Sequence, residues 1–447
     1  MKALFFESYG RWFRIAEWIR KRFTRPGLMT LAMAGLSGIV GIDTHLSLAY
    51  QVFAFLAAAL SLSAIHGFLF RARFSAERRL PRLGTVGTPV RYRVRISAGN
   101  RGLPDGLHLR EIPPDPRPDR DTFLNTPEPG EGGRNLFDRL TGYYRWEWLV
   151  ERRRFGRARP HPVPSLAPGE TRTVVMSLVP RRRGLLVLRG LTLLRTDPLG
   201  LFRGAVSFER RQSMTILPER FPLPPLRLPG GRRFHAGGVA LTSSVGDAEE
   251  FVGLRDYRPG DPLRRIHWRS WARTGRPVVK EYQEEFFVRH ALILDTFLAA
   301  DESEAFEAAV SVAASFAYTL ETRDSLLELL FVGTEAYPVT AGRGLGSMER
   351  ILEVLASVRP TRDASFPSLA ALVSRRASDL SGCICVLLAW DEERRELVRR
   401  LQSLRIPLRA LVVAEGAQGL DLGPMGDFPE SFHPIEPGRV AEGLARL

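Results

Sequence analysis

The chain opens with two long uncharged, apolar stretches. The first covers residues 26–42 and the second residues 46–70, and only Asp43, Thr44 and His45 lie between them. About 17–25 apolar residues are enough to cross a bilayer as a helix. The pattern therefore predicts a transmembrane helical hairpin over residues 26–70.

Basic residues flank the two stretches on their outer ends, and the short loop between them carries none. Residues 1–25 hold several arginines and lysines, and the second stretch is followed by Arg71, Arg73, Arg78 and Arg79. The positive-inside rule then predicts a multi-pass protein of the cell membrane, with both termini and the soluble domains in the cytoplasm. A signal peptide is the alternative interpretation of the first stretch, and it too leaves most of the chain cytoplasmic.

The first 25 residues mix aromatic and basic side chains, in the sequence FFESYGRWFRIAEWIRKRF. Such a composition is typical of an amphipathic helix that lies in the membrane interface. We expect residues 1–25 to form such a basic segment.

Residues 71–225 contain short runs of alternating apolar and polar residues that end at Gly, Pro or Asn. This period of two, repeated over several runs, predicts a β-sandwich domain. A Pro-rich insertion interrupts the pattern at about residues 112–168, and we expect it to be a surface loop with one short helix around residues 135–150. The sequence from Asp197 to Phe202 predicts a turn in which Gly200 has a positive φ. We expect Leu201 and Phe202 to pack onto the core of the sandwich.

Residues 286–447 alternate apolar strands with amphipathic helices. This order predicts a parallel, doubly wound α/β sheet, whose ligands bind at the carboxyl ends of the strands. Asp295 and Asp391 fall at two such ends. Cys383 and Cys385 lie two apart on one predicted strand, so we expect buried, reduced thiols on one face of the sheet rather than a disulfide.

The charge of the chain is unevenly distributed. The net charge is +15, yet residues from Val288 onward hold 16 basic and 23 acidic residues, a net charge of −7, which leaves +22 for the preceding residues. This asymmetry indicates separate domains, with the basic part facing a membrane or an acidic partner. Because the chain has no groove-reading motif, we expect no nucleic-acid partner.

Residues 226–285 comprise a Gly- and Ser-rich linker followed by a dense motif of charged and aromatic residues. Pro259 and Gly260 predict a turn, and Asp261 is expected to cap a helix over 262–274 that ends at Gly275. The turn, the helix cap and the helix end do not account for six other side chains of the motif. We interpret these six as a docking surface: Arg255, Tyr257, Arg265, Trp268, Arg273 and Lys280.

Three other interpretations of this motif stay open. The same residues would also suit an internal network of ion pairs that locks a loop onto a neighbouring domain, with Trp268 in the core. The arginines and tryptophans could instead contact phosphates and bases. A metal-dependent hydrolase would use the polar side chains Asp256, Asp261, Lys280 and Glu281.

Residues 250–284, EFVGLRDYRPGDPLRRIHWRSWARTGRPVVKEYQE, resemble the bacterial family catalogued as domain of unknown function 58. PRRRGLLVLRG and TDPLGLF fit the β-domain of the same family. Trp271 departs from the pattern, because the family usually has a small residue there. The resemblance implies a membrane-anchored protein that works with a MoxR-type AAA+ ATPase, and sometimes with a transglutaminase-like membrane protein.

The predicted α/β domain is similar to a von Willebrand factor A domain, whose first strand ends in Asp-x-Ser-x-Ser and binds a divalent cation. Asp295, Phe297 and Ala299 stand at these positions here, so two hydroxyl ligands are missing and the cation site is degenerate. We therefore expect no metal, no cofactor and no catalysis. The expected function is a scaffold for the assembly or maturation of client complexes.

Overall fold

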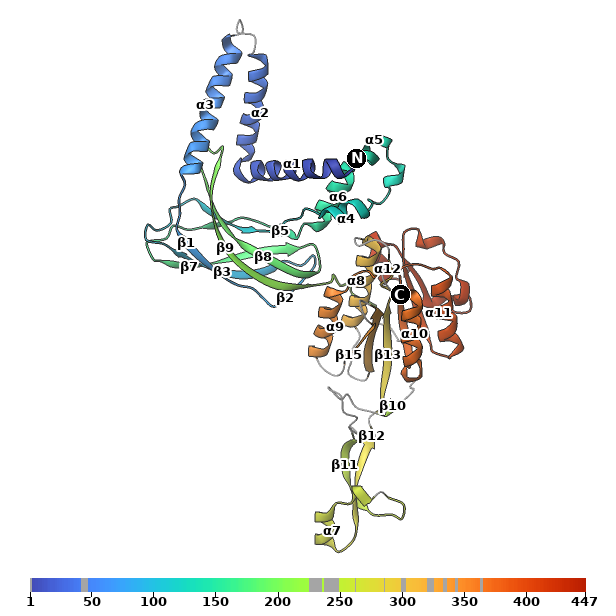
Figure 1. Ribbon diagram of the computed structural model, residues 1–447. Helices are drawn as coiled ribbons and strands as arrows, with labels where there is room; N and C mark the ends of the chain where they lie inside the picture. Colours follow the sequence, from blue (N-terminus) through green and yellow to red (C-terminus); the bar gives the residue numbers. More distant parts are fainter. Residues whose placement is uncertain are drawn as a thin grey trace. The chain divides into compact units, whose positions relative to one another are not determined.

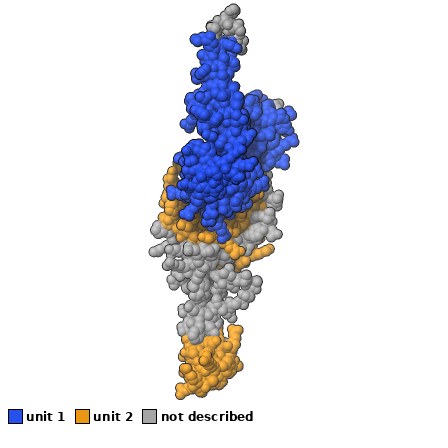
Figure 2. All heavy atoms as spheres, turned by 90° about the vertical axis from the view of Figure 1, so that its left-hand side faces the viewer, with its two compact units in different colours: residues 1–218 blue, residues 219–447 orange. Residues whose placement is uncertain are grey.

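The computed structural model describes residues 2–41, 47–224, 235–236, 249–261, 263–284, 286–298, 303–319, 325–332, 336–341, 345–361 and 365–447. The chain divides into two compact units, residues 1–218 and residues 219–447, which Figure 2 colours separately. The protein is therefore multidomain, and each unit is described by itself below.

Three helices begin the first unit: α1 (Lys2–Arg22), α2 (Arg25–Val40) and α3 (Ser47–Leu69) (Figure 1). The second and third pack together closely, since a Cβ added to Gly38 would lie 3.1 Å from the ring of Phe53. Among the described residues, one helix, Leu48–Leu69, is long and apolar enough to cross a membrane, whereas α2 has 16 residues. The predicted loop at Asp43–His45 lies outside the described residues.

Two sheets follow the helices and share one core. The order β1-β3-β7-β5 forms the first sheet and β2-β9-β8-β4-β6 the second. Buried side chains from both, such as Val94 and Leu188, belong to one apolar cluster, as expected for a sandwich. The strands are β1 (Phe74–Arg79), β2 (Leu83–Thr85), β3 (Val90–Ala98), β4 (Leu107–Ile112), β5 (Gly156–Ala158), β6 (His161–Val163), β7 (Thr171–Pro180), β8 (Gly184–Thr196) and β9 (Arg203–Leu217).

One of the arginines expected to flank the membrane is instead inside this sandwich. Arg78 lies on β1 and is 2% exposed, and its guanidinium donates to both carboxylate oxygens of Glu111 at 3.0 and 3.1 Å. The Tyr92 hydroxyl donates to the same carboxylate at 2.8 Å. Arg78 therefore contributes to the core, because a buried charge is tolerated only with such partners.

The Pro-rich insertion is more ordered than the expected loop with one short helix. It folds into α4 (Arg120–Asn125), α5 (Leu136–Thr141) and α6 (Tyr143–Arg153), and Gly142, at φ 69°, separates the last two. Its Phe123, Trp146 and Leu149 form a small buried cluster, against which Phe6 and other aromatic residues of α1 pack. The insertion is thus a support for the first helix.

The turn at residues 197–202 packs differently from the prediction. The Asp197 carboxylate accepts from the backbone N–H of Leu199 at 2.9 Å and of Phe202 at 2.6 Å, and Gly200 has the expected positive φ of 74°. Phe202, however, packs among helix side chains, with its ring 5.1 Å from that of Phe23 and 5.4 Å from that of Phe68. The turn therefore holds the junction between α1 and α2 to the sandwich.

The second unit contains the α/β sheet. Its order is β15-β14-β13-β16-β17-β18, with a short extra strand, β10 (His235–Ala236), paired to β13. All pairings along the main path are parallel except β14 with β15, so the sheet is mixed rather than purely parallel. The strands are β13 (Phe286–Leu294), β14 (Ser325–Val332), β15 (Ala336–Ala341), β16 (Gly382–Leu387), β17 (Leu408–Val413) and β18 (Phe432–Ile435).

Helices cover the sheet on both faces: α8 (Glu304–Thr319), α9 (Leu345–Ser357), α10 (Phe366–Arg376), α11 (Glu392–Ser403) and α12 (Val440–Leu444) (Figure 1). Cys383 and Cys385 are free thiols in one cluster with side chains of α10 and α11, which confirms their shared face. The Cys385 thiol and burial together raise the pKa of Cys383. Both thiols therefore act as apolar core groups.

Candidate functional site

The dense motif forms an arm built on two antiparallel strands, β11 (Glu249–Asp256) and β12 (Val278–Glu284) (Figure 1). We call residues 249–284 the motif arm. Between the strands lie a short 3₁₀ turn, η2 (Leu263–Arg265), and one helix, α7 (Trp268–Thr274). The register shifts between Phe251 and Gly253, which marks a bulge.

The helix of the motif arm is shorter than the predicted 262–274. Ile266 forms a bridge with Val279, and the His267 N–H donates to the Val278 carbonyl at 2.8 Å. These bonds hold the chain extended at residues 266 and 267, so the helix begins only at Trp268. It ends as predicted at Gly275, which has φ 68° and donates to the Trp271 carbonyl.

Asp261 does not cap that helix, and its role is to close the preceding turn. The Arg255 guanidinium donates to both of its carboxylate oxygens, each at 2.7 Å, and the Arg258 N–H donates to one of them at 2.8 Å. These bonds, with that of Arg255 the largest influence, lower the pKa of Asp261 to about 2. Arg255 is therefore engaged within the motif arm, where it braces residues 255–261.

The two tryptophans of α7 stack on each other at the surface. Their ring centroids are 5.3 Å apart at an interplanar angle of 20°, and Trp268 is 64% exposed. The interpretation that placed Trp268 in a core is therefore wrong. The large Trp271, half-buried, is accommodated by this stacking.

The structure brings only part of the predicted docking set together. Trp268 and Arg273 are exposed on α7, and Arg265 is half-buried in η2. Lys280 lies on β12, opposite Leu254, and the Tyr257 N–H donates to the Pro277 carbonyl at 2.9 Å. The exposed surface is thus centred on α7, whereas Arg255 and Tyr257 belong to its support.

The described side chains of the alternative hydrolase site form no metal centre. Asp261 is bound by Arg255 and Arg258, and Asp256 is exposed at the end of β11. The backbone of Glu281 pairs with Gly253, while its side chain lies outside what the structure describes. No group of three or more His, Cys, Asp or Glu side chains in the described ranges could hold a metal ion.

A second polar site lies in the sheet, where the strand order reverses. Counted from β13, the order is 3-2-1-4-5-6, and ligands of such sheets bind at the carboxyl ends near the reversal between β13 and β16. Asp295 follows β13 there and is fully buried. Its carboxylate accepts from the N–H groups of Phe297 at 3.0 Å and Leu388 at 3.1 Å.

The other described hydrogen bonds of the Asp295 carboxylate come from one arginine. Arg394, on the first turn of α11, donates to both carboxylate oxygens, at 3.0 and 3.4 Å. It also donates to Asp391 at 2.6 Å and stacks 4.4 Å from the centre of the Phe366 ring. Burial disfavours the charged form, yet the two carboxylates outweigh it and raise the pKa of Arg394.

These residues do not fit a divalent cation. A guanidinium, a fixed positive charge, already satisfies Asp295, and Phe297 offers no side-chain oxygen. The Thr296 hydroxyl donates instead to the Val332 carbonyl at 2.5 Å. Sequence reasoning located Asp295 and Asp391 but missed Arg394, whose only signal was its place three residues after Asp391.

Comparisons with known proteins cover this part of the chain. Residues 253–395, which include the motif arm from Gly253 and the Asp295–Arg394 pair, match the family described as "Protein of unknown function DUF58". The uncharacterized protein YeaD of Bacillus subtilis (strain 168) is 27% identical over 152 residues, which cover 33% of this chain and 36% of that protein. The chain thus matches about a third of the length of this curated relative.

Similarity to solved structures is weak. The manganese-loaded TRAP protein of Plasmodium vivax has a TM-score of 0.27 and 12% identity, covering 35% of this chain and 72% of that one. A GH20 exo-β-N-acetylglucosaminidase from Vibrio harveyi has a TM-score of 0.14 and 10% identity, covering 76% of this chain and 57% of that one. Neither supports an argument about fold or function.

Proposed function

We propose that this chain is a non-enzymatic, membrane-anchored interaction protein whose motif arm docks a protein partner. The observation that carries the proposal is the exposed Trp268, stacked on the half-buried Trp271, in an arm that the Arg255–Asp261 ion pair holds in shape. Tryptophan and arginine are the side chains that most often dominate binding energy at interfaces. A surface ordered before binding also loses less entropy when the partner docks.

The charge of the motif arm indicates the chemistry of the partner. Residues 253–280 contain eight basic side chains and two acidic ones, Asp256 and Asp261. Such a surface complements an acidic patch, which would steer association and fix orientation. A MoxR-type AAA+ ATPase is the partner that we propose, with a role in the assembly or maturation of client complexes. This assignment, like that of a transglutaminase-like membrane protein as a second partner, rests on the family resemblance.

The α/β sheet adds a second recognition element in this proposal. Its strand order, its antiparallel edge strand and the position of Asp295 support a von Willebrand factor A-like domain. Because Arg394 neutralises Asp295, that domain would recognise its partner without a bridging cation. Recognition then depends on the protein surface alone.

The bilayer is the third partner. Helix α3 supports one span, and the apolar run of α2 beside it supports a second, which together would form the hairpin. Basic residues at both outer ends favour cytoplasmic termini and soluble domains. The docking surface would then be presented to cytoplasmic proteins.

Capture of a purified MoxR-type ATPase by the tagged full chain in membranes tests this function. We expect Trp268→Ala to reduce capture at least about tenfold, because truncating a central interface tryptophan often costs 2 kcal/mol or more. Phe428→Ala is the matched control, since Phe428 is another exposed aromatic residue of the second unit. Equal capture by both variants would exclude docking at α7. Stoichiometric metal in the purified chain would instead favour the hydrolase around Asp256, Asp261, Lys280 and Glu281.

A further inference from the structure

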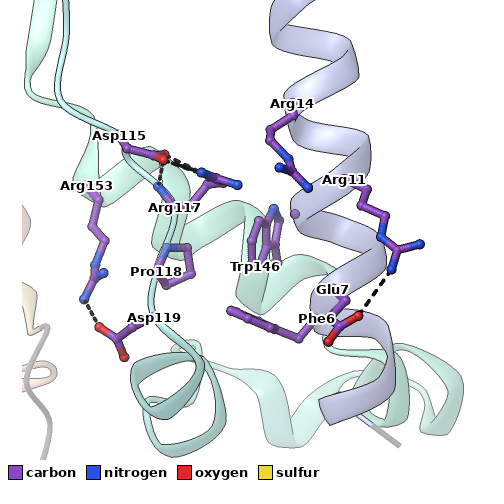
Figure 3. A pocket seen from close by; sticks show the side chains of 11 residues that line it. Phe6, Glu7, Arg11, Arg14, Asp115, Arg117, Pro118, Asp119, Trp146 and Arg153 are labelled. Atoms are coloured by element: carbon purple, nitrogen blue, oxygen red, sulfur yellow. Dashed lines mark hydrogen bonds and ion pairs between the residues drawn. The ribbon is translucent and has the colours of Figure 1, made fainter.

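The first unit contains a cavity of about 520 Å³ between α1 and the insertion (Figure 3). Phe6 and Trp146 form an apolar wall, with their rings 5.5 Å apart. The rest of the lining is strongly charged, and the side chains come from α1, from residues 115–119 and from α6. A cavity with an apolar wall and several convergent charges is the usual form of a small-ligand site.

The charges of this cavity do not cancel. Three carboxylates line it, and each has an arginine partner: Glu7 with Arg11 at 3.4 Å, Asp115 with Arg117 at 2.5 Å, and Asp119 with Arg153 at 3.6 Å. A fourth arginine, Arg14, also lines the cavity and makes no ion pair with any described residue.

Two of these carboxylates have a lowered pKa, which favours their charged form. The Arg117 guanidinium lowers the pKa of Asp115, and the Thr122 N–H lowers that of Asp119. Four arginines against three carboxylates leave one positive charge, held by Arg14. One singly charged anion would therefore neutralise the site.

The surroundings of α1 indicate where this anion comes from. Leu4, Trp12 and Ile15 are spaced for one face of the helix and are 79%, 70% and 50% exposed. At its other end the helix continues into α2 through Thr24, whose N–H is bonded to the Leu201 carbonyl at 3.1 Å. The helix that bears this exposed apolar face thus leads directly into the apolar helix α2.

An amphipathic helix of this kind lies in the plane of the membrane, with its apolar face toward the acyl chains and its polar flanks among the headgroups. Glu7, Arg11 and Arg14 are spaced i, i+4 and i+7, on the flank between the exposed apolar face and the face packed on the insertion. In that orientation the cavity, which Glu7, Arg11 and Arg14 line, would lie at the level of lipid phosphates.

The geometry points to a binding site for the phosphodiester headgroup of an anionic phospholipid in this cavity. Arg14 supplies the uncompensated charge, and Arg11 and Arg117 line the same cavity. Phe6 and Trp146 contact the glycerol carbons. This inference rests on the membrane anchoring proposed above, and it gives the insertion a function as one wall of a lipid site.

The test measures binding of dioctanoyl phosphatidylglycerol to the full chain purified in detergent. We expect Arg14→Gln to weaken binding about fivefold, as for loss of one basic residue near a charged lipid. Arg14→Lys should retain most of the affinity. Arg20→Gln is the matched control, because Arg20 is also exposed on α1 but does not line the cavity.

Three results would overturn the inference. Equal losses for Arg14→Gln and Arg20→Gln would show general attraction to a basic helix. Equal affinity for dioctanoyl phosphatidylcholine would remove the requirement for net negative charge. Equal affinity for inorganic phosphate would mean a free anion rather than a lipid. Membrane sedimentation and ATPase capture of Arg14→Gln are measured in parallel, so failure of the anchor or of docking is distinguished from failure of this site.

Discussion

Two of the arginine–aspartate pairs within the matched segment differ in burial. Asp295 and Arg394 are enclosed in the α/β sheet, with side chains 0% and 9% exposed. Asp261 and Arg255, in the motif arm, have side chains 16% and 33% exposed. Both arginines donate to both oxygens of their aspartate.

The comparison shows that one pairing chemistry can serve two purposes. In the buried pair, each ion depends on the other, because water cannot replace a lost partner. In the motif arm, water can solvate either ion, so the pair orders a turn and adds little to stability. The first pair occupies a position where ligands of such sheets bind, whereas the second holds the turn of the motif arm in shape, as the proposed docking requires.

Removing Arg394 should have the largest effect. Arg394→Ala leaves the Asp295 carboxylate buried without its cation, and we expect the free energy of unfolding of the second unit to fall by about 3–5 kcal/mol. Hydrogen exchange of β13 and α11 in the full chain measures this. Arg399→Ala is the control on the same helix, since Arg399 pairs with Glu392 and Glu396 at the surface. Similar exchange in both variants would contradict the role given to Arg394.

Substituting Asp261 should have a smaller and local effect. Asp261→Asn removes the negative charge that Arg255 binds. We expect exchange of the N–H group of residue 261, which bonds to the Arg258 carbonyl, to accelerate by up to about fivefold. Global unfolding should not change measurably. Capture of the ATPase should weaken as the arm loses order. If the N–H groups of the motif arm exchange at the same rate as in the unmodified chain, Asp261 does not stabilise the arm.

Acidification should release the pair of the motif arm, Arg255 and Asp261. The folded-state pKa of Asp261 is depressed to about 2 by Arg255, whereas an unpaired Asp titrates near 3.9. Its contribution is therefore present above about pH 4 and is lost as the pH falls through about 2. Carbon-13 NMR of a carboxylate-labelled sample reports this titration, and Arg255→Ala should shift the midpoint upward. A midpoint near 4 in the unmodified chain would contradict the pairing.

Divalent cations should have the smallest effect, near zero. Because Arg394 occupies the carboxylate of Asp295, millimolar Mg²⁺ or Mn²⁺ should not raise the midpoint of thermal unfolding of the second unit. A ligand at one hundred times its Kd would add about 2.7 kcal/mol, which is easily measured. A clear increase that Asp295→Asn abolishes would restore the cation site.

Periodicity predicted the elements of the molecule better than their contacts. The alternating strands of residues 71–225, the strands and helices from residue 286 onward, and the apolar run of α3 were all visible in the sequence, because these patterns follow the local geometry of strands and helices. The insertion was underestimated, since its three short helices depend on packing against α1 and have little periodicity of their own. The helix of the motif arm was predicted too long for a similar reason, as Ile266 and His267 bond to β12.

The sequence by itself determined the apolar helix near the N-terminus, the strand-rich and α/β parts, the buried thiols and the position of Asp295 at a strand end. Only the tertiary structure decided which partner each charge has. Arg78 was expected beside the membrane and lies in the sandwich core, and Arg394 occupies the carboxylate of Asp295. The physical reason is that an ion pair forms between groups far apart in the sequence, and nothing in local composition records which groups the fold will bring together.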